Sequence, residues 1–593
     1  MCGIVGGVSP NPIYNYLIEG LKTIEYRGYD SAGIAVLSNK KVEIHRVLGR
    51  VQDLDEAIVK PLLSPIGIGH TRWATHGKPS VANAHPHMSS SGLFTIIHNG
   101  VIENFRNLKK SLVEKGYDFH SETDTEVIAN LLEDNFLKTK DVLLALKETM
   151  LQLKGSYALA ILFTGEMDKV FFAKNHSPLL IGHAEDGNFL ASDYLPMLKV
   201  ASQFLAVEDR QYGYVSQRDV ALYGLEKNEP LAFSYHKTNL KAQVLDLNGY
   251  DHYMLKEIEE ADQCLNLLIA NYYDGEKYLF NHKMIKEMQE ADNIVFLACG
   301  TSYHACLIGS EYMRRSGKRS DVYIASEWAY NPYSSGNKTV YIVVSQSGET
   351  ADLINCMAII KKIGSTVITI SNTQGSTLAR NAKYTILLYA GVEVAVASTK
   401  AYVAQVAVLA MIVGALNRKT NVVDDLLLVI KAQRIIIENH QKVIELAEFI
   451  ATKKDVYFLG RGLDYYLALE CSLKLKEITY IHSEAFPGGE LKHGPIALIE
   501  QDTPVIGFCS DPTTAEQMRS NMHEVEARGA RIIIISSQSL SQTGDDFVVS
   551  DLPLYLTPLI KVIFGQYLAY YVALKRGLNI DKPRNLAKSV TVE

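Results

Sequence analysis

Short runs of alternating hydrophobic and polar residues occupy the first part of the chain, up to about residue 240. Gly, Pro, Ser or Asn separates most of these runs, which is typical of strands joined by turns. The expected strands are 3–8, 31–37, 41–47, 66–70, 94–99, 157–163, 170–174, 179–182 and 189–192. Apolar residues at helical spacing predict helices over 14–25, 102–115 and 123–137. Together these elements predict an α+β domain in which helices cover mainly antiparallel strands.

A second pattern follows a segment, about Glu226 to Gly249, in which the periodicity fades. Here apolar strand-like runs precede long helical patterns. This arrangement occurs twice, with expected strands at 293–300, 340–345 and 365–371 in the first copy and at 455–462, 504–510 and 531–537 in the second. The duplication predicts two α/β domains with parallel sheets.

Size and charge narrow the class of protein. A chain of 593 residues is too long for one core and suggests about three or four domains. Hydrophobic residues make up 47% and charged residues 21%, which is typical of a soluble globular protein. A net charge of -7 without a basic block argues against nucleic acid or an anionic membrane as the main partner.

The cysteines and the apolar runs indicate the compartment. The seven cysteines are scattered and never in CxxC spacing, which favours a reducing cytoplasm and disfavours a disulfide framework or a zinc site. The start lacks a basic stretch followed by an apolar one, so we expect no signal peptide. The most apolar run, Ala401 to Leu416, contains Gln405 and is short for a bilayer, so it predicts a buried helix.

A thiol lies one residue behind the first position, in Met1-Cys2-Gly3-Ile4-Val5-Gly6. If Met1 is removed, Cys2 carries both a thiol and a free α-amino group. A thiol of pKa about 8.5 is only a few per cent thiolate at neutral pH, and an α-amine of pKa about 7.7 to 8.0 can accept its proton. Nucleophile and base then belong to one residue. The alternative is a cysteine that serves only as a small buried hydrophobe.

Polar clusters interrupt the strand pattern at several points. Hydrolysis of an amide through a thioester needs an oxyanion donor, a clamp for a carboxylate and an acceptor for an ammonium group. Asn99 with Gly100, Arg72 and Asp124 fit these three roles in that order. Each also has a structural alternative, because Asn-Gly favours a hairpin, the segment near Thr123 matches a capping box, and Arg72 can be a surface charge.

Four motifs, taken in order with Cys2, resemble the class II glutamine amidotransferase domain of the N-terminal nucleophile type. They are RGYDS (27–31), TRWATHG (71–77), HNG (98–100) and SETDTE (121–126). The resemblance implies an αββα glutaminase in which Cys2 attacks the side-chain amide of glutamine and Asn99 and Gly100 hold the oxyanion. It places Arg72, Trp73, Thr75, His76 and Asp124 in the glutamine site. It also suggests Trp73 as a gate for ammonia, for which a large core aromatic is the alternative.

Hydroxyl-rich turns follow two strands of the first α/β copy. They are Gly300-Thr301-Ser302 and Ser345-Gln346-Ser347-Gly348-Glu349-Thr350. Ligands bind at the carboxyl ends of parallel strands, where hydroxyls and helix N-termini can hold a phosphate. The serines can instead be plain N-caps. Since the second copy lacks a matching run, we expect one phosphate site, in the first copy.

The segment SQSGETAD (345–352) and the duplication resemble the sugar isomerase (SIS) domain. Three further motifs, LKLKEI (473–478), GELKHGP (489–495) and the tail PRNLAKSVTVE (583–593), resemble the glutamine:fructose-6-phosphate amidotransferase family. This resemblance implies ring opening by His493, a Schiff base on Lys588, proton transfer by Glu477 and a supporting role for Lys474. It implies that Thr301, Ser302, Ser345, Gln346, Ser347 and Thr350 hold the phosphate and that Val396 and Ser398 line the sugar.

The family resemblance implies transfer of the amide nitrogen of L-glutamine to D-fructose 6-phosphate with ketose-to-aldose isomerisation, the first step of amino-sugar synthesis. The expected layout is a glutaminase domain at 2–240, a linker with connecting helices at 241–280, SIS domains at 281–420 and 421–580, and a catalytic tail at 581–593. A homodimer through the SIS domains is expected, with His493 entering the partner's site. No metal or organic cofactor is called for. The alternatives are a glutaminase with another acceptor and a non-catalytic sugar-phosphate sensor.

Overall fold

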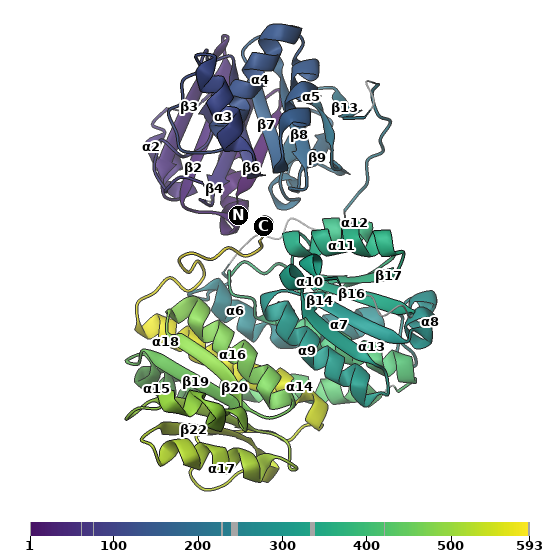
Figure 1. Ribbon diagram of the computed structural model, residues 1–593, viewed down its shortest axis with the longest axis vertical. Helices are drawn as coiled ribbons and strands as arrows, with labels where there is room; N and C mark the ends of the chain where they lie inside the picture. Colours follow the sequence, from purple (N-terminus) through teal and green to yellow (C-terminus); the bar gives the residue numbers. More distant parts are fainter. Residues whose placement is uncertain are drawn as a thin grey trace. The chain divides into compact units, whose positions relative to one another are not determined.

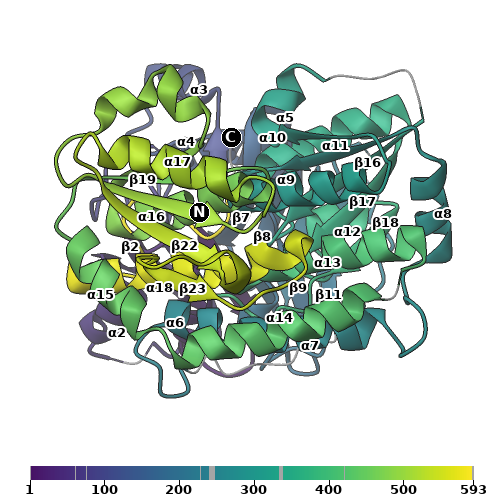
Figure 2. The ribbon, with the colours of Figure 1, turned by 90° about the horizontal axis from the view of Figure 1, so that it is seen from below.

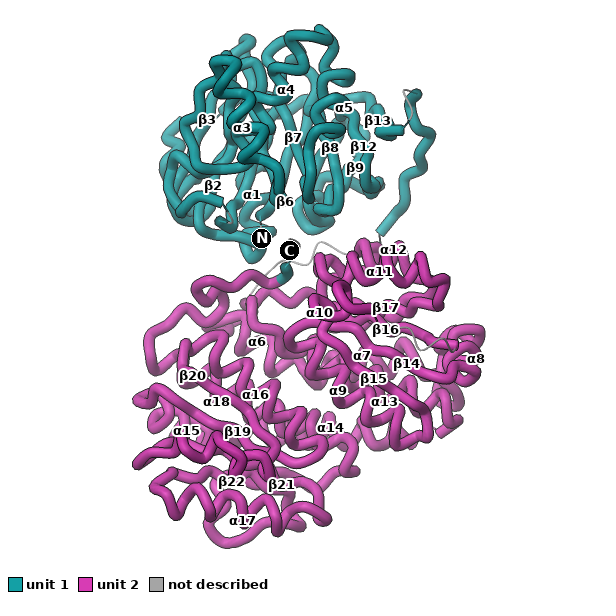
Figure 3. Tube along the Cα trace, in the orientation of Figure 1, with its two compact units in different colours: residues 1–246, 589–593 teal, residues 247–588 magenta. Residues whose placement is uncertain are grey.

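The computed structural model describes residues 2–60, 62–74, 76–226, 229–238, 247–332, 338–419 and 421–590. The chain divides into two compact units (Figure 3). Unit 1 comprises residues 1–246 and 589–593, and unit 2 comprises residues 247–588.

Unit 1 contains two antiparallel sheets. The first has the strand order β11-β9-β10-β1-β4-β2-β3 and the second the order β13-β12-β8-β7-β6-β5. The strands of the first sheet are β1 (Gly3–Val8), β2 (Ser31–Ser38), β3 (Lys41–Leu48), β4 (Ile66–Arg72), β9 (Leu180–Ala184), β10 (Gly187–Ala191) and β11 (Gln203–Ala206). Those of the second are β5 (His87–Met88), β6 (Phe94–Ile102), β7 (Gly155–Phe163), β8 (Glu166–Asn175), β12 (Gln211–Ser216) and β13 (Val220–Gly224).

The two sheets pack face to face across one apolar layer. Ile68 from β4, Ile97 from β6 and Phe172 from β8 meet in this layer. The outer face of the first sheet is covered by α1 (Tyr14–Ile24) and α2 (Val51–Ala57). The outer face of the second is covered by α3 (Phe105–Glu114), α4 (Thr125–Thr139) and α5 (Val142–Gln152) (Figure 1). The predicted αββα order is therefore confirmed.

The central strand β1 fixes the start of the chain. All six of its residues are buried, and it lies between β10 and β4. A Cβ on Gly7 would approach the carbonyl oxygen of Asn188 to 2.9 Å, so this close pairing requires glycine. Gly3 pairs with Thr71, which places the preceding Cys2 beside the end of β4.

One expected helix starts later than predicted. The pattern indicated a helix over 102–115, but β6 continues to Ile102 and α3 begins at Phe105. The reason is that β6 pairs with β7 up to the pair Ile102 and Gly155, so the ladder holds these residues extended.

Unit 2 contains two parallel sheets of five strands, ordered β15-β14-β16-β17-β18 and β20-β19-β21-β22-β23. The first comprises β14 (Asn293–Ala298), β15 (Ser320–Ile324), β16 (Thr339–Ser345), β17 (Thr366–Ser371) and β18 (Tyr384–Leu387). The second comprises β19 (Asp455–Gly460), β20 (His482–Pro487), β21 (Pro504–Cys509), β22 (Arg531–Ser537) and β23 (Phe547–Val549). Counted along the chain, both sheets have the order 2-1-3-4-5, which confirms the predicted duplication.

The helices of unit 2 pack against both of its sheets and join them into one compact unit. They are α6 (Tyr253–Glu259), α7 (Ala261–Tyr272), α8 (His282–Glu290), α9 (Gly300–Arg315), α10 (Ala325–Tyr330), α11 (Ala351–Ile363), α12 (Thr377–Asn381), α13 (Lys400–Asn417), α14 (Asn421–Glu438), α15 (Gln441–Ile450), α16 (Leu463–Thr479), α17 (Ala515–Glu526) and α18 (Thr557–Lys575). A single hydrophobic core runs from β14 and β16 through α9, α13, α16 and α18 to β19 and β21. Helices α14, α15 and α16 pack around α18 (Figure 2).

Helix α13 is the predicted apolar helix. Within the described part of the chain it alone is long and apolar enough for a membrane span by composition. In this fold, however, 83% of that window is buried inside the protein. The apolar side chains of α13 therefore form part of the hydrophobic core of unit 2.

Candidate active sites

Cys2 is half-buried and sits against the residues that follow β4. The backbone N–H of Trp73 donates to its Sγ at 3.2 Å, and the side-chain amide of Asn99 donates to its carbonyl oxygen at 3.0 Å. Burial raises the pKa of the Cys2 thiol, against the opposing effects of the Trp73 N–H and the Arg72 cation. The thiol therefore needs a base before it can act as a nucleophile.

A neutral histidine orients the Asn99 amide. His70 Nε2 lies 3.0 Å from the carbonyl oxygen of His98 and 3.1 Å from Asn99 Oδ1. Because a carbonyl oxygen only accepts, His70 Nε2 carries the hydrogen and Asn99 Oδ1 is an acceptor. The NH₂ end of Asn99 consequently faces Cys2. Burial lowers the pKa of His70 to about 3, so the ring is neutral.

His85 packs against the same ring. Its Nδ1 lies 3.0 Å from His70 Nδ1 and 3.1 Å from His70 Nε2, and because Nε2 carries the hydrogen, His70 Nδ1 is the nitrogen that can accept from His85. Sequence reasoning missed both residues as members of the site. The signal was weak, because nothing in the local pattern distinguishes a histidine that orients an amide from one that only fills the core.

Gly100, next to Asn99, has a φ of 136°. A Cβ at this position would lie 2.0 Å from the carbonyl oxygen of Ser156 on the paired strand. Only glycine fits this backbone. The backbone N–H of Gly100, the second predicted oxyanion donor, directly follows Asn99 in the chain.

Arg72 and Asp124 are both buried. The Arg72 guanidinium donates to the carbonyl oxygens of His76 and Gly77, while its Nη1 has no hydrogen-bond partner among the described residues. Asp124 Oδ2 accepts the backbone N–H of Ile102 at 2.8 Å. A buried cation with a spare donor and a buried carboxylate thus stand in the same unit as Cys2.

The remaining predicted glutamine-site residues lie in the segment after Arg72. The Trp73 ring meets Tyr29 edge-on at 5.7 Å, and the His76 ring meets Phe105 at 4.9 Å. Thr75 lies outside the described residues. Asp30, not singled out before, accepts the backbone N–H of Ala74 at 2.8 Å and so supports this segment.

In unit 2, the predicted phosphate-site residues lie at the carboxyl ends of β14 and β16, two neighbouring parallel strands (Figure 1). This is where the strand order reverses, a position at which α/β sheets bind ligands. Ser345 and Thr350 hydroxyls are 2.9 Å apart, and Gly348 N–H donates to Ser345 Oγ at 3.0 Å. Ser302 Oγ accepts from Gln405 at 2.9 Å.

The corresponding end of β21 in the second copy is filled by a buried charged cluster. Ser510 Oγ donates to Asp464 at 2.6 Å and accepts from Lys561 Nζ at 2.6 Å. These three side chains use their hydrogen-bonding groups on one another and fill the space at the end of the strand. This is compatible with a single phosphate site, which stays a prediction.

Lys474, Glu477 and Thr301 form one network between the two sheets of unit 2. The fully buried Lys474 donates to Glu477 at 2.5 Å and to Thr301 Oγ1 at 2.9 Å. Glu470, one helical turn before Lys474, accepts from Thr301 at 3.1 Å and contacts His304 Nδ1 at 2.8 Å. Burial raises the pKa of Glu477 against the opposing charge of Lys474. Sequence reasoning missed Glu470 and His304.

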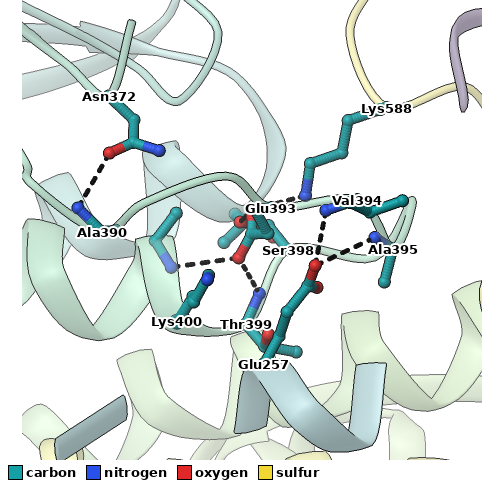
Figure 4. Close-up of polar contacts among 12 residues, drawn as sticks. Glu257, Asn372, Ala390, Glu393, Val394, Ala395, Ser398, Thr399, Lys400 and Lys588 are labelled. Carbon is teal, nitrogen blue, oxygen red and sulfur yellow. Dashed lines mark hydrogen bonds and ion pairs between the residues drawn. The ribbon is translucent and has the colours of Figure 1, made fainter. Parts of the chain in front are cut away.

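Lys588 is held in place by a buried carboxylate. Its side chain is 3% exposed, and its Nζ donates to Glu393 Oε2 (Figure 4). Ser398 Oγ donates to the same carboxylate at 2.9 Å. Val396 is anchored nearby, since its N–H donates to the carbonyl oxygen of Asp581 in the tail. The positive charge of Lys588 also opposes the rise in the pKa of Glu477, after the larger effects of burial and of Lys474.

His493 is not brought to this network. It ends a short 3-10 helix, Glu490–His493, and is exposed. Within the described ranges its ring makes no hydrogen bond or ion pair. The predicted ring-opening residue therefore stands apart from Lys588, Glu477 and Lys474 within one chain.

Two domain families match the sequence. The glutamine amidotransferase domain matches residues 70–199, and the SIS domain matches residues 287–415 and 449–575. These matches confirm the fold class that the motifs predicted.

Relatives extend this likeness over the full length. The glutamine–fructose-6-phosphate aminotransferase (isomerizing) of Listeria monocytogenes is 44% identical over 607 residues, covering 100% of both chains. That of Bacillus subtilis is 42% identical over 605 residues, again with complete coverage of both. The solved C-terminal domain of glucosamine-fructose-6-phosphate aminotransferase from Francisella tularensis is 32% identical, with a TM-score of 0.55, and covers 57% of this chain and 100% of that one. The chain therefore belongs to the glutamine–fructose-6-phosphate aminotransferase (isomerizing) family.

Proposed function

We propose that the chain transfers the amide nitrogen of L-glutamine to D-fructose 6-phosphate and isomerises the product to D-glucosamine 6-phosphate, releasing L-glutamate. The observation that carries this proposal is that one chain of this family contains both a thiol site in unit 1 and a buried lysine–carboxylate site in unit 2. Unit 1 holds Cys2 against the Asn99 amide, and unit 2 holds the buried Lys588–Glu393 and Lys474–Glu477 pairs and carries hydroxyl-rich turns at a sheet's ligand-binding edge. The scheme uses no metal or organic cofactor, and we place the enzyme in the cytoplasm.

The glutamine half-reaction follows from the groups around Cys2. The Cys2 α-amine, freed by removal of Met1, accepts the thiol proton, and the thiolate attacks the amide carbon. The Asn99 amide and the Gly100 N–H stabilise the oxyanion. Arg72 binds the substrate's carboxylate and Asp124 its ammonium group. Ammonia leaves, and water then hydrolyses the thioester to glutamate.

Within the glutamine site, Thr75 and His76 complete the substrate pocket in this proposal. Trp73, whose backbone N–H contacts Cys2, gates the release of ammonia.

The sugar half-reaction uses the network of unit 2. Hydroxyls of Thr301, Ser302, Ser345, Ser347 and Thr350, with Gln346, hold the phosphate, while Val396 and Ser398 contact the sugar chain. His493 opens the sugar ring, and the Lys588 amine forms an imine at C2. Ammonia then displaces Lys588, and Glu477 moves a proton from C1 to C2 while Lys474 stabilises its carboxylate.

The exposed position of His493 supports a homodimer. A residue that must contact the sugar, yet lies apart from its own chain's Lys588, can serve the site of a second copy. We therefore propose a symmetric dimer formed through the SIS domains, in which His493 completes the partner's site.

The test is formation of glucosamine 6-phosphate from glutamine and fructose 6-phosphate by the wild type and by Cys2→Ala. We expect the wild type to form the amino sugar and Cys2→Ala to form none with glutamine. Glutamine hydrolysis by the wild type without any amino sugar would contradict the assigned acceptor.

A further inference from the structure

Glu393 is the most completely coordinated carboxylate around the predicted sugar site. It lies in the loop between β18 and α13, and its side chain is 0% exposed. Its Oε1 accepts the backbone N–H groups of Thr399 at 2.9 Å and Ala401 at 3.1 Å. Its Oε2 accepts from Lys588 Nζ and from Ser398 Oγ (Figure 4). Four donors, two of them at the start of an 18-residue helix, favour the ionised carboxylate.

A second carboxyl group, Glu257 of α6, lies on the other side of the same loop. Its Oε1 accepts the N–H groups of Val394 at 2.5 Å and Ala395 at 3.3 Å, while its Oε2 has no hydrogen-bond partner in the described part of the chain. Burial, and next the negative charge of Glu393, raise the pKa of Glu257 to about 8. At neutral pH it is therefore largely protonated, and its role is to hold the loop that aims Glu393.

The other charged or titratable groups facing this cluster have partners of their own or are buried. Lys400 pairs with Glu260 at 2.7 Å, and Lys474 pairs with Glu477 at 2.5 Å. Cys264 is a buried thiol whose pKa burial raises to about 12. Glu393 is thus the carboxylate in direct contact with Lys588.

This contact meets a chemical requirement of the proposed function. An amine must lose its ammonium proton before it can attack a carbonyl carbon, and a side chain buried to 3% exposure has little access to water as the acceptor. Stability alone does not explain why Lys588 and Glu393 form a buried ion pair. The free energy needed to remove both charges from water is about as large as the free energy gained from their attraction.

Building on the proposed function, we propose that Glu393 is the general acid–base partner of Lys588 in imine formation. Glu393 takes one proton from the Lys588 ammonium group, and the freed nitrogen lone pair forms the C–N bond as the carbonyl oxygen takes a second proton from that nitrogen. Glu393 then returns its proton to this hydroxyl group, which leaves as water. The products are the protonated imine and the regenerated carboxylate, so protons and charge balance.

The experiment measures imine formation directly. The enzyme is incubated with fructose 6-phosphate and cyanoborohydride, which reduces the imine to a stable amine, and the adduct on Lys588 is quantified by mass spectrometry. We compare the wild type with Glu393→Gln, which keeps the side chain's shape but cannot accept the proton. Glu260→Gln is the matched control, because it removes the carboxylate of the neighbouring buried Lys400 pair.

We expect Glu393→Gln to trap the adduct about a hundredfold more slowly than the wild type, and Glu260→Gln within about threefold of it. The Gln variant depends on hydroxide or solvent as the proton acceptor, so its rate relative to wild type should fall as the pH is lowered from about 7.5 to about 6. The effects of groups that titrate in both proteins cancel in this ratio of rates. The pH range of the experiment also lies below the pKa of Glu257, which is about 8.

A Gln variant that traps the adduct at the wild-type rate, or with the same pH dependence, would overturn the inference and leave the proposed function intact. If Glu393→Gln does not fold, as judged by thermal unfolding, Glu393→Asp is used instead. The Asp variant retains a proton acceptor, so its rate should be lower by a factor that does not change with pH, and a changing factor would refute the role. If the wild type forms no adduct on Lys588, the imine step fails and the inference fails with it.

Discussion

At the scale of single residues, one hydrogen bond decides which end of the Asn99 amide faces Cys2. The oxygen and nitrogen ends of an amide have the same shape, so packing alone does not distinguish them. His70 distinguishes them because its Nε2–H can only donate. An amide turned the other way would present an acceptor to the developing oxyanion and repel it.

We predict that His70→Ala lowers kcat for glutamine hydrolysis by about tenfold to a hundredfold while KM changes by less than about threefold. The physical reason is that the Asn99 amide loses its orientation while the groups that bind glutamine remain. The measurement is steady-state glutamine hydrolysis together with the thermal midpoint.

The control for this prediction is His183→Ala, which removes a similar contact, His183 Nδ1 to Asn188 at 2.8 Å, elsewhere in unit 1. It should retain kcat. Equal losses of kcat in the two variants, or a loss that tracks the thermal midpoint, would indicate a purely structural role for His70.

At the scale of elements, strands β4, β5 and β6 and the segment before β5 bring four histidines together. His70, His85, His87 and His98 are all buried, and His70, His85 and His87 lie in contact through their rings. Burial lowers the pKa of all four, so the folded chain binds protons on them only at low pH. The unfolded chain binds these protons near the ordinary value of about 6.5.

We therefore predict that unit 1 is stable above about pH 6.5 and loses stability as the pH falls below it, because the unfolded state then binds more protons than the folded state. The loss should be about 1 kcal/mol for each of His70, His85 and His87 between about pH 6.5 and 5.5, and His98 contributes with the same sign. The measurement is urea unfolding of Trp328→Phe, in which Trp73 of unit 1 is the remaining tryptophan. A urea midpoint that stays constant across this range would contradict the prediction.

At the scale of the whole molecule, the position of His493 separates two arrangements of the sugar site. If each chain used its own His493, variants at His493 and Lys588 would be inactive in every mixture. If His493 serves a second copy, a mixed dimer contains one site with both residues intact.

We predict that His493→Ala and Lys588→Ala, each inactive alone, recover about a quarter of the wild-type synthase activity when subunits are mixed in equal amounts and allowed to exchange. Half of the dimers are then mixed, and one of their two sites is intact. The control mixture is Lys588→Ala with Glu477→Ala. Because these two residues belong to one chain's network, no mixed dimer has an intact site, and activity should stay absent. Failure of the first mixture despite demonstrated exchange would exclude the shared site.

Much of the fold could be predicted because its signals are local. Period-two runs, glycines and apolar helices indicated the strands around Cys2, the duplicated parallel sheets and the burial of α13. Short edge strands such as β5 and β23 were missed, because two or three residues carry too little pattern to be recognised. The motifs also placed Cys2 and the hydroxyl-rich turns at strand ends, as the structure has them, whereas Asn99, expected at the end of its strand, lies inside β6.

The sequence by itself determined the order of elements, the two chemistries and the family. Tertiary structure alone decided which side chains support them: His70 behind Asn99, Glu470 beside Lys474, and Glu393 against Lys588, its partner 195 residues further along the chain. Nothing in the local pattern distinguishes Glu393 from a surface glutamate. A buried carboxylate needs hydrogen-bond donors, and the fold provides them for Glu393 from a loop, a helix N-terminus and the C-terminal tail.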